Sequence, residues 1–275
     1  MATELQNVLI GLIISLALGV FSFRRETLSR TGTMAAVLLG VVVYVLGGSS
    51  WFGVLAAFFV TSVFFTRFRA AQKEEVVREF AKGGVRDFWQ VLANGGLAGL
   101  LSFAWFYYHQ PVIFYAFLGV IATVTADTWA TELGILGRRK PRLITNWEKV
   151  PIGTSGAVSG FGIAVALAGG ALIGAVAYYL LGFSTGAGLK PSLLMVPIAA
   201  LSGLAGALFD SLMGATLQAM YYCTKCKKET EKTVHNCGTR TTAIRGFKWF
   251  DNDLVNLVST ILGAAVAAGL YLLLL

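Results

Sequence analysis

The chain has 275 residues, of which 56% are hydrophobic and only 13% are charged, and its mean hydropathy is +0.71. Soluble domains are about one-quarter charged, so this composition excludes a disordered chain, a fibrous repeat and an ordinary water-soluble enzyme. The apolar residues come in blocks of about 17–25, which is the length that crosses a bilayer as a helix. We therefore expect an all-α protein, a polytopic transmembrane helix bundle that forms a single domain over residues 1–275.

Apolar blocks predict about seven to eight spans. The residues before the first block carry Glu4 and no Lys or Arg, so we expect an uncleaved first helix rather than a signal peptide. Only Gly47–Ser50 separates the second and third blocks, and we keep them apart because merging them would move segment 67–88 to the other side of the membrane. The eight candidate spans are 5–23, 31–46, 50–66, 89–108, 111–131, 157–182, 193–218 and 253–275.

The net charge of +8 has a clear positional pattern. Four long loops, at 24–30, 67–88, 132–156 and 219–252, hold 21 of the 22 Lys and Arg residues. With eight spans these loops lie on one side, which the positive-inside rule makes cytoplasmic, with both termini outside. We therefore expect a multi-pass protein of the cell (plasma) membrane and no nucleic-acid partner. Within the second loop, residues 67–84 are predicted to form a helix along the membrane surface.

Polar residues enter four of the predicted spans, always at the end that faces the basic loops. Several recur at i, i+4 and i+8, so they form stripes along one face of a helix. The four groups are Arg86, Gln90 and Asn94; Asp127, Thr128 and Glu132; Asp210, Ser211 and Gln218; and Asn252, Asp253 and Asn256. They predict a polar site at one depth near one membrane face.

The carboxylates are the most informative of these residues. An Asp in a membrane helix costs about 2.5–3.5 kcal/mol on insertion scales, so Asp127, Asp210 and Asp253 need a partner or a task. The amides alone fit interhelical hydrogen bonds equally well. Three carboxylates that share a site need a cation, and hard oxygen ligands with room for water and phosphate describe Mg²⁺. We expect these three residues to be catalytic and to hold Mg²⁺.

Two glycine turns with nearby cations precede predicted helices. The first contains Lys82, Gly83 and Gly84; the second contains Lys149, Gly153, Thr154 and Ser155, and Ser159 follows it. Exposed backbone N–H groups at a helix start form an anion cradle, although helix capping explains the second turn equally well. The pattern is not that of a P-loop. Beside the carboxylates, these turns predict a phosphate–metal site.

The loop 219–252 contains every cysteine of the chain. Cys223, Cys226, His235 and Cys237 form a compact Cys₃His set, which suits a structural Zn²⁺ in a small insert. The alternative is loose thiols beside an incidental histidine. A closed four-ligand site leaves no open position for substrate, so we expect a role in folding the loop rather than in catalysis.

Taken together, the ordered motifs resemble one membrane family, which joins transmembrane protein 19 to the chloroplast phytyl-phosphate kinases. The resemblance runs from about residue 80 to the end and more loosely over the first spans. The motifs are Lys82–Asp87 with Gln90–Gly96, Ala126–Gly134, Pro141–Thr145, Val150–Gly156, Asp210–Gln218 and Asn252–Asn256.

The resemblance implies a CTP-dependent kinase that converts an isoprenoid monophosphate to the diphosphate within an all-helical bundle. Asp127, Asp210 and Asp253 would then hold Mg²⁺ and triphosphate. The phosphate-binding group would be Lys82, Arg86, Lys149, Thr154 and Ser155, with Gln90, Asn94, Asn252 and Asn256 orienting the phosphates. Two features depart from relatives: the Cys/His loop, which some lack, and Ala157, where a second glycine is common.

Two alternatives remain open at this stage. An ion- or proton-coupled transporter would use the same carboxylates as a path, and it predicts polar residues in the opposite half of the spans. A cytidylyltransferase that forms a CDP-lipid would share the nucleotide and metal chemistry. The isoprenoid chain length and the oligomeric state do not follow from the sequence.

Overall fold

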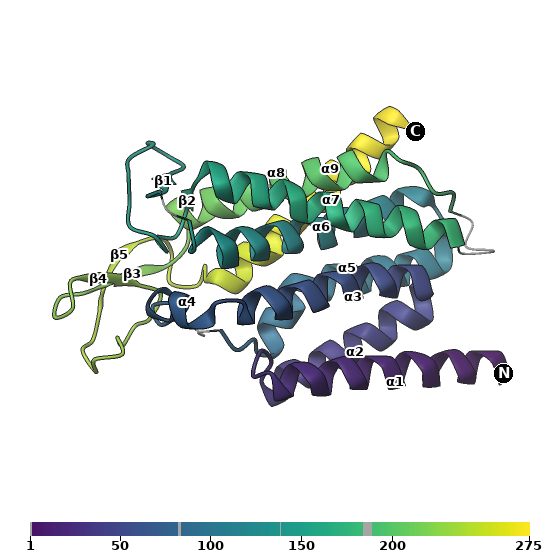
Figure 1. Cartoon of the computed structure of the whole chain (residues 1–275), viewed down its shortest axis with the longest axis horizontal. Helices are drawn as coiled ribbons and strands as arrows, with labels where there is room; N and C mark the ends of the chain where they lie inside the picture. Colours follow the sequence, from purple (N-terminus) through teal and green to yellow (C-terminus); the bar gives the residue numbers. More distant parts are fainter. Residues whose placement is uncertain (1, 82–83, 138, 184–188) are drawn as a thin grey trace.

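The fold is a bundle of long helices with loops and small sheets at one end (Figure 1). The structure is a computed structural model that describes residues 2–81, 84–137, 139–183 and 189–275, without the side chains of residues 2–4. Both termini lie at the end of the bundle opposite to the sheets (Figure 1). The predicted polytopic helix bundle is confirmed.

Eight of the described helices have 18–24 residues. Seven are long and apolar enough to cross a membrane, and the eighth, α5, has a similar length but carries Gln90, Asn94 and two tyrosines. These helices are α1 (Ala2–Arg24), α2 (Arg30–Gly47), α3 (Ser49–Arg67), α5 (Phe88–Tyr108), α6 (Pro111–Gly134), α7 (Gly160–Phe183), α8 (Met195–Thr216) and α9 (Asn252–Leu274).

Two boundaries test the predicted spans. The second and third spans are separate helices, because Gly48 at φ 88° ends α2 and starts α3 with a backbone conformation that favours glycine. The span predicted to begin at 157 starts instead at Gly160. Its first residues form strand β2 (Ala157–Val158), which pairs antiparallel with β1 (Arg142–Leu143). The polar loop before α7 is therefore held as a hairpin.

The predicted surface helix over 67–84 is wrong in length. Helix α4 covers only Ala70–Val77. Arg69, at φ 51°, separates it from α3, and the helix ends at a turn that begins with Arg78. A side chain at Gly153 would clash with Val76, so α4 lies against the loop before α7. Val77 and Phe80 line an internal cavity. The segment therefore covers the loop end of the bundle.

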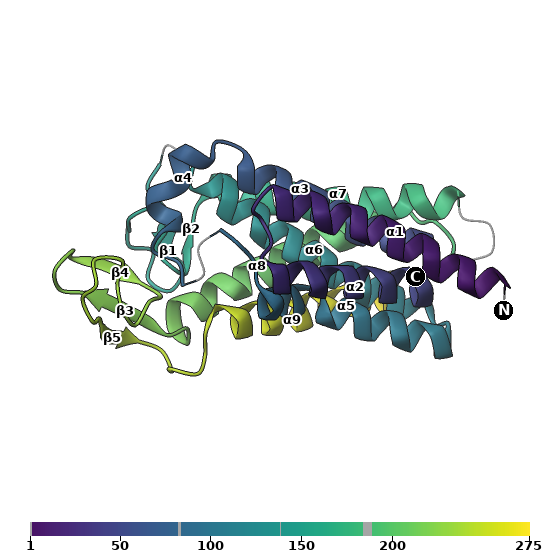
Figure 2. The same cartoon turned by 90° about the horizontal axis from the view of Figure 1, so that it is seen from below.

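Helix α6 is the central helix of the bundle, seen between the other helices in Figure 2. Phe114, Phe117, Leu118 and Ile121 are fully buried, as expected for a helix that is apolar on every face. Small residues let its neighbours approach: a Cβ at Gly203 of α8 would lie 2.8 Å from the Ala122 carbonyl oxygen. The central position carries the polar end of α6 into the interior.

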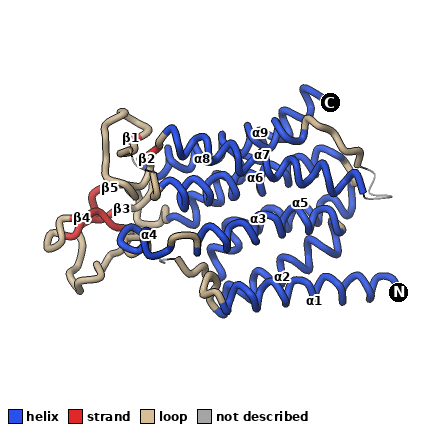
Figure 3. The backbone as a smooth tube through the Cα atoms, viewed as in Figure 1, coloured by secondary structure: helices blue, strands red, loops and turns tan. Residues whose placement is uncertain are grey.

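The loop between α8 and α9 forms a small sheet beyond the helices (Figure 3). Its strands are β3 (Met220–Cys223), β4 (Lys228–Thr230) and β5 (Thr242–Arg245), in the antiparallel order β4-β3-β5. The Glu231 amide donates to the Glu79 carbonyl oxygen at 3.2 Å, and the Thr230 hydroxyl donates to the same oxygen at 2.7 Å. The sheet is therefore tied to the segment that follows α4.

Candidate functional site: an acidic cavity at the loop end

A cavity of about 320 Å³ lies where α5, α6, α8 and α9 meet the loops. Its size is at the lower end of the range for ligand sites in proteins. The sequence-predicted residues in its wall are Gly84, Arg86, Gln90, Asn94, Asp127, Thr128, Glu132, Gly153, Thr154, Ser155, Ser159, Asp210, Ser211, Gln218, Asn252, Asp253 and Asn256. Residues from four helices and three loops are thus gathered around one space.

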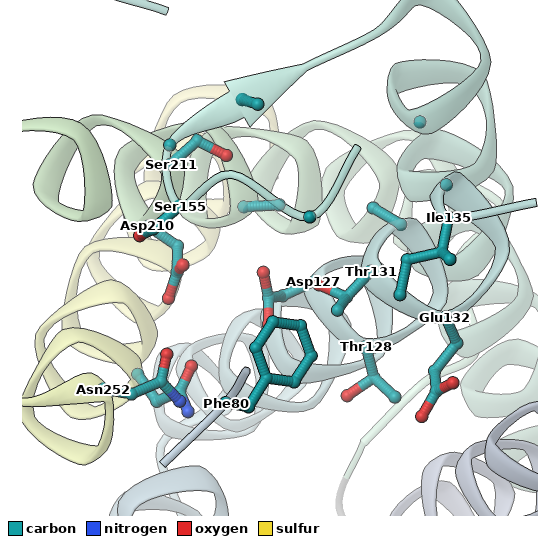
Figure 4. A pocket seen from close by; sticks show the side chains of 18 of the residues that line it. Phe80, Asp127, Thr128, Thr131, Glu132, Ile135, Ser155, Asp210, Ser211 and Asn252 are labelled. Carbon is teal, nitrogen blue, oxygen red and sulfur yellow. The ribbon is translucent and has the colours of Figure 1, made fainter. Parts of the chain in front are cut away.

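The three aspartates come from three different helices. Asp127 of α6 and Asp210 of α8 point into the cavity from two sides, with Asn252 of α9 nearby (Figure 4). Asp210 Oδ2 lies 3.2 Å from the hydroxyl of Ser259. The start of α9 is fixed because the Asp251 carboxylate accepts the Leu254 amide at 3.1 Å, which caps the helix and sets Asp253 in the cavity wall.

The electrostatic balance of the cavity is strongly negative. Six carboxylates line it: Asp127, Glu132, Asp210, Glu231, Asp251 and Asp253. Among the described lining residues Arg86 is the single cation. Negative groups crowded in a part-buried space repel one another unless a cation lies between them. The arrangement is therefore suited to a bound cation, and the carboxylate oxygens are the ligands that Mg²⁺ prefers.

Arg86 is held by its backbone just before α5. Its amide donates to the Thr27 carbonyl oxygen, and its own carbonyl oxygen accepts the Ser29 amide, both at 3.0 Å. Gly32 leaves room for this contact, since a Cβ there would lie 2.3 Å from the Arg86 oxygen. Burial lowers the pKa of the guanidinium, and the nearby charges of Glu132 and Asp127 oppose that change. Arg86 remains charged at neutral pH.

Gln90 has a local structural role at the start of α5. Its amide donates to the Asp87 carboxylate at 3.0 Å, and its side-chain oxygen accepts the Asp87 amide at 3.3 Å. This capping box satisfies amides at the helix start. Gln90 therefore lines the cavity while its side-chain oxygen caps the helix.

The glycine turn before α7 forms the opposite wall. Gly153 and Gly156 have φ values of 89° and 81°, and a Cβ at Gly156 would lie 2.5 Å from the Ala215 backbone nitrogen. The Ser159 hydroxyl accepts the Gly162 amide at 3.0 Å, so Ser159 caps α7. The turn combines left-handed glycines with a helix start, the geometry of an anion cradle.

A chain of hydrogen bonds joins this turn to the segment after α4. The Ser155 hydroxyl donates to the Gln218 oxygen at 2.7 Å, and the Gln218 nitrogen donates to Glu231 Oε1 at 3.0 Å. Glu231 Oε2 accepts the Ala81 amide at 2.9 Å. Burial raises the pKa of Glu231 above its ordinary value, and the hydrogen bonds from Ala81 and Gln218 oppose the rise. These contacts fix the rim of the cavity.

Two predicted residues have other surroundings. Lys149 is exposed on the loop beside Arg142, away from the residues that line the cavity. Glu132 is in the cavity wall, but Thr66 donates to its Oε1 at 2.8 Å and Lys73, which is 1% exposed, pairs with its Oε2. Lys82 and Gly83 lie outside the described residues.

Some cavity residues escaped the sequence analysis. Phe80, Glu231 and Asp251 line the cavity. The position of Asp251 before a helix signals a cap, but nothing local marks Phe80 or Glu231. Both reach the cavity because the sheet holds segment 78–81 against the bundle.

The four Cys and His residues form one cluster beside segment 78–81. Ligand atoms of Cys223, Cys226, His235 and Cys237 lie within 4.8 Å of one another, and the three cysteines are free thiols. The Cys223 and Cys237 sulfurs are 3.7 Å apart, far longer than a disulfide and close to the roughly 3.8 Å expected of two sulfurs on one tetrahedral zinc. The cluster could hold a metal ion.

The surroundings of the cluster favour metal binding. Hydrogen bonds with Thr239 and His235 lower the pKa of Cys237 to about 5, so it is a thiolate at neutral pH. His235 Nε2 lies 3.0 Å from Glu79 Oε2, which leaves Nδ1 for the cluster. A carboxylate on the outer nitrogen is the common support of a metal-binding histidine.

Comparisons with known proteins support the family assignment. The model of the family described as "Integral membrane protein DUF92" matches residues 13–264. Protein PGR of Arabidopsis thaliana is 34% identical, with 93% of each chain covered. An uncharacterised membrane protein of Methanocaldococcus jannaschii is 28% identical over 95% of this chain and 93% of its own.

A further relative is "Protein VTE6, chloroplastic" of Arabidopsis thaliana, which is 27% identical over 87% of this chain and 64% of its own. No solved structure matches the chain. The family match and the confirmed helix bundle agree with the resemblance given by the motifs. The chain is a multi-pass integral membrane protein that belongs to the DUF92 family.

Proposed function

We propose that the protein is a CTP-dependent kinase that phosphorylates an isoprenoid monophosphate, of the phytyl or prenyl type, to the diphosphate. The observation that carries the proposal is that Asp127, Asp210 and Asp253, from three helices, share one cavity with Arg86 and a glycine turn. This combination provides oxygen ligands for a divalent cation and donors for phosphate in the same space. The resemblance of the motifs to phytyl-phosphate kinases supports the substrate class.

The donor set fits Mg²⁺. Carboxylates are its usual protein ligands, together with water and substrate phosphate, and Asp127, Asp210 and Asp253 are the residues that would hold it. When bound, the ion neutralises charge on the triphosphate and on the transferring phosphoryl group. The carboxylate excess over Arg86 also explains why this site would bind nucleotide only with the cation.

The reaction needs positioning more than a strong base. An oxygen of the lipid phosphate, already ionised at neutral pH, attacks the γ-phosphorus of CTP. A new P–O–P bond forms, the bond from the γ-phosphorus to the β–γ bridging oxygen breaks, and CDP leaves with that electron pair. Arg86 would bind the lipid phosphate, the amides of Gly153 and Ser155 would bind the triphosphate, and Asn94, Asn252 and Asn256 would orient them.

We further propose Zn²⁺ at the Cys/His cluster, with a structural role, and the cell membrane as the location, with the loop end cytoplasmic. The sulfur separation and the Glu79 contact support the metal. The orientation rests on the Lys and Arg residues of the loops.

The test is a product assay. The protein purified in detergent is incubated with Mg²⁺, CTP and phytyl, farnesyl or geranylgeranyl monophosphate, and the products are identified by mass spectrometry. We expect prenyl diphosphate and CDP in equal amounts. ATP, GTP and UTP in parallel reactions define the nucleotide, and Asp127→Asn is the inactive control.

Other outcomes point to other functions. CDP-lipid with pyrophosphate would identify a cytidylyltransferase. No lipid product with any of the three substrates would overturn the kinase and favour the transporter. A transporter predicts polar residues in the half of the bundle opposite to the loops. That half contains a buried apolar cluster, which includes Trp51, Phe114 and Phe117.

A further inference from the structure

A second, apolar cavity lies on the other side of Arg86. It has a volume of about 70 Å³ and is enclosed by α1, α2, α3 and α5. Its wall is largely aliphatic and aromatic, with Leu18, Leu39, Phe59 and Val91 among its members; Ser15, Thr27 and Ser62 add small hydroxyl groups. A void of this size in an apolar interior favours an apolar ligand over water.

The two cavities meet at two residues. Arg86 and Asn94 are in the wall of both, and no other described residue is shared between the two walls. One face of this pair looks toward the carboxylates of α6, α8 and α9, and the other looks toward the apolar side chains of α2 and α3. The pair therefore stands at the boundary between a polar cavity and an apolar one.

An amphiphile with one anionic head and an apolar tail matches this boundary. The guanidinium of Arg86 is a strong hydrogen-bond donor to phosphate groups. The backbone of Arg86 is hydrogen-bonded to residues 27–29 at the rim of the apolar cavity. A phosphate bound there would lie beside the acidic cavity with its cation. The carbon attached to that phosphate would lie at the entrance of the apolar cavity.

We propose that the second cavity binds the isoprene unit next to the phosphate of the lipid substrate, between α1, α2, α3 and α5. This inference rests on the proposed function and adds to it the place of the lipid. The rest of the chain lies outside the cavity, in the bilayer.

The volume sets how much of the lipid is bound. A water-sized group needs about 10–15 Å³ of such space, so 70 Å³ holds roughly five to seven of them. One isoprene unit has five carbons. The site is therefore expected to be selective for the first isoprene unit and to accept different chain lengths beyond it.

The first test fills the cavity. Ala36 and Ala56 line it and are part-buried, so Ala36→Leu and Ala56→Leu each add three carbons to the void. We expect the KM for prenyl monophosphate to rise about tenfold or more in each variant, with the KM for CTP unchanged. The control is Ala175→Leu, the same change at an exposed position of α7. An unchanged lipid KM in folded variants overturns the inference.

The second test needs no variant and no turnover. A prenyl monophosphate with a diazirine in its first isoprene unit is photolysed with the wild-type protein in detergent, and the labelled peptides are sequenced by mass spectrometry. We expect label on α1, α2, α3 or α5, for example at Leu18, Leu39 or Phe59, and competition by unlabelled substrate. Label confined to α7 or α8 overturns the inference.

The two proposals fail separately. If diphosphate forms but the label falls on α7 or α8, the lipid position is wrong and the kinase stands. If the label falls on α1, α2, α3 or α5 but no prenyl monophosphate is phosphorylated, the lipid site stands as a binding site and the kinase is wrong.

Discussion

The acidic cavity and the Cys/His cluster both gather ligand atoms, but they are built in opposite ways. The cavity takes its three aspartates, Asp127, Asp210 and Asp253, from α6, α8 and α9, whose positions are set by packing around the central helix. The cluster takes its four ligands from a single loop of 15 residues, 223–237, carried by strands of three or four residues.

The difference concerns what holds each site together without its ion. Helices of more than 20 residues keep the aspartates in place through buried apolar contacts, so the cavity does not depend on the ion for its shape. A three-stranded sheet with such short strands has little core, and small metal-binding folds commonly need their ion to fold. We therefore expect the metal ion to act together with the substrates in the acidic cavity and to stabilise the fold in the Cys/His cluster.

The two regions meet at segment 78–81. Phe80 and Ala81 line the cavity, while Glu79 contacts His235 and Glu231 contacts Ala81. The cluster thereby shapes the rim of a site to which it gives no ligand. The predictions below separate the two roles, beginning with the largest expected effect.

Removing a carboxylate should abolish turnover and leave the fold intact. Asp127→Asn and Asp210→Asn keep the side-chain shape but remove the negative charge that a divalent cation requires. We expect each to lower kcat at least about a thousandfold, measured as prenyl diphosphate formed. The melting temperature in detergent should stay within a few degrees of wild type, because helix packing fixes this region.

A charge change away from the cavity is the control. Glu148→Gln lies on an exposed loop and should leave kcat unchanged. Near-normal turnover in either aspartate variant would show that this residue is not part of the reaction site. The acidic cavity could then no longer be distinguished from the Cys/His cluster as the site whose ion takes part in the reaction.

Arg86 should have the next largest effect. Arg86→Ala removes the guanidinium from the junction of the two cavities, and we expect kcat/KM for the lipid phosphate to fall about a hundredfold, since a charged hydrogen bond to phosphate is worth about 1.5–3 kcal/mol. Arg86→Lys should recover part of this loss, because it keeps the charge but not the paired donors. Equal losses for lipid phosphate and CTP would argue against a specific lipid-phosphate contact.

Losing the metal should loosen the rim without destroying the cavity. Cys237→Ser removes one ligand, and we expect about one zinc per chain in the wild type and none in the variant, measured by elemental analysis. Amide exchange should rise in residues 78–81 and 220–245, with the helices unchanged. The KM for CTP should rise about tenfold.

Lys225→Ser is the matched control for that loop, since Lys225 lies between Cys223 and Cys226 but is exposed and offers no metal ligand. It should keep zinc, exchange and KM at wild-type values. A zinc-free variant with unchanged exchange at 78–81 would contradict the structural role of the cluster.

The sequence could predict those features that depend on local pattern. Apolar runs of about 20 residues predicted the spans, and Gly48 marked the break between α2 and α3. The recurring polar residues at one end of four spans predicted a shared site, because residues at one membrane depth are brought together when helices pack. The Cys/His spacing predicted a cluster, since all four ligands are close along the chain.

What the sequence could not predict depends on contacts between distant segments. Residues 67–84 have the charge and apolar pattern of a surface helix, yet Phe80 and Ala81 line the cavity, beside the hydrogen bond from Thr230 to the Glu79 carbonyl oxygen. No local sequence pattern marks Glu231, because its position depends on a contact between the sheet and Ala81, which is 150 residues away in the sequence. Glu132 looked like a phosphate-site residue because its buried partner, Lys73, is far away in the sequence.

The last prediction concerns that pair, which anchors α4 to α6. Lys73 is 1% exposed, and besides Glu132 its ammonium donates to the carbonyl oxygen of Phe65 at 2.6 Å. Glu132→Gln leaves a buried charge without its counter-charge, a loss of about 3–5 kcal/mol in comparable pairs, so the melting temperature in detergent should fall. The double variant Lys73→Met/Glu132→Leu removes both charges and should recover most of that stability, with kcat within about threefold of wild type. A stable but inactive double variant would instead give Glu132 a direct part in the reaction, and α4 would then have to be regarded as part of the reaction site rather than its cover.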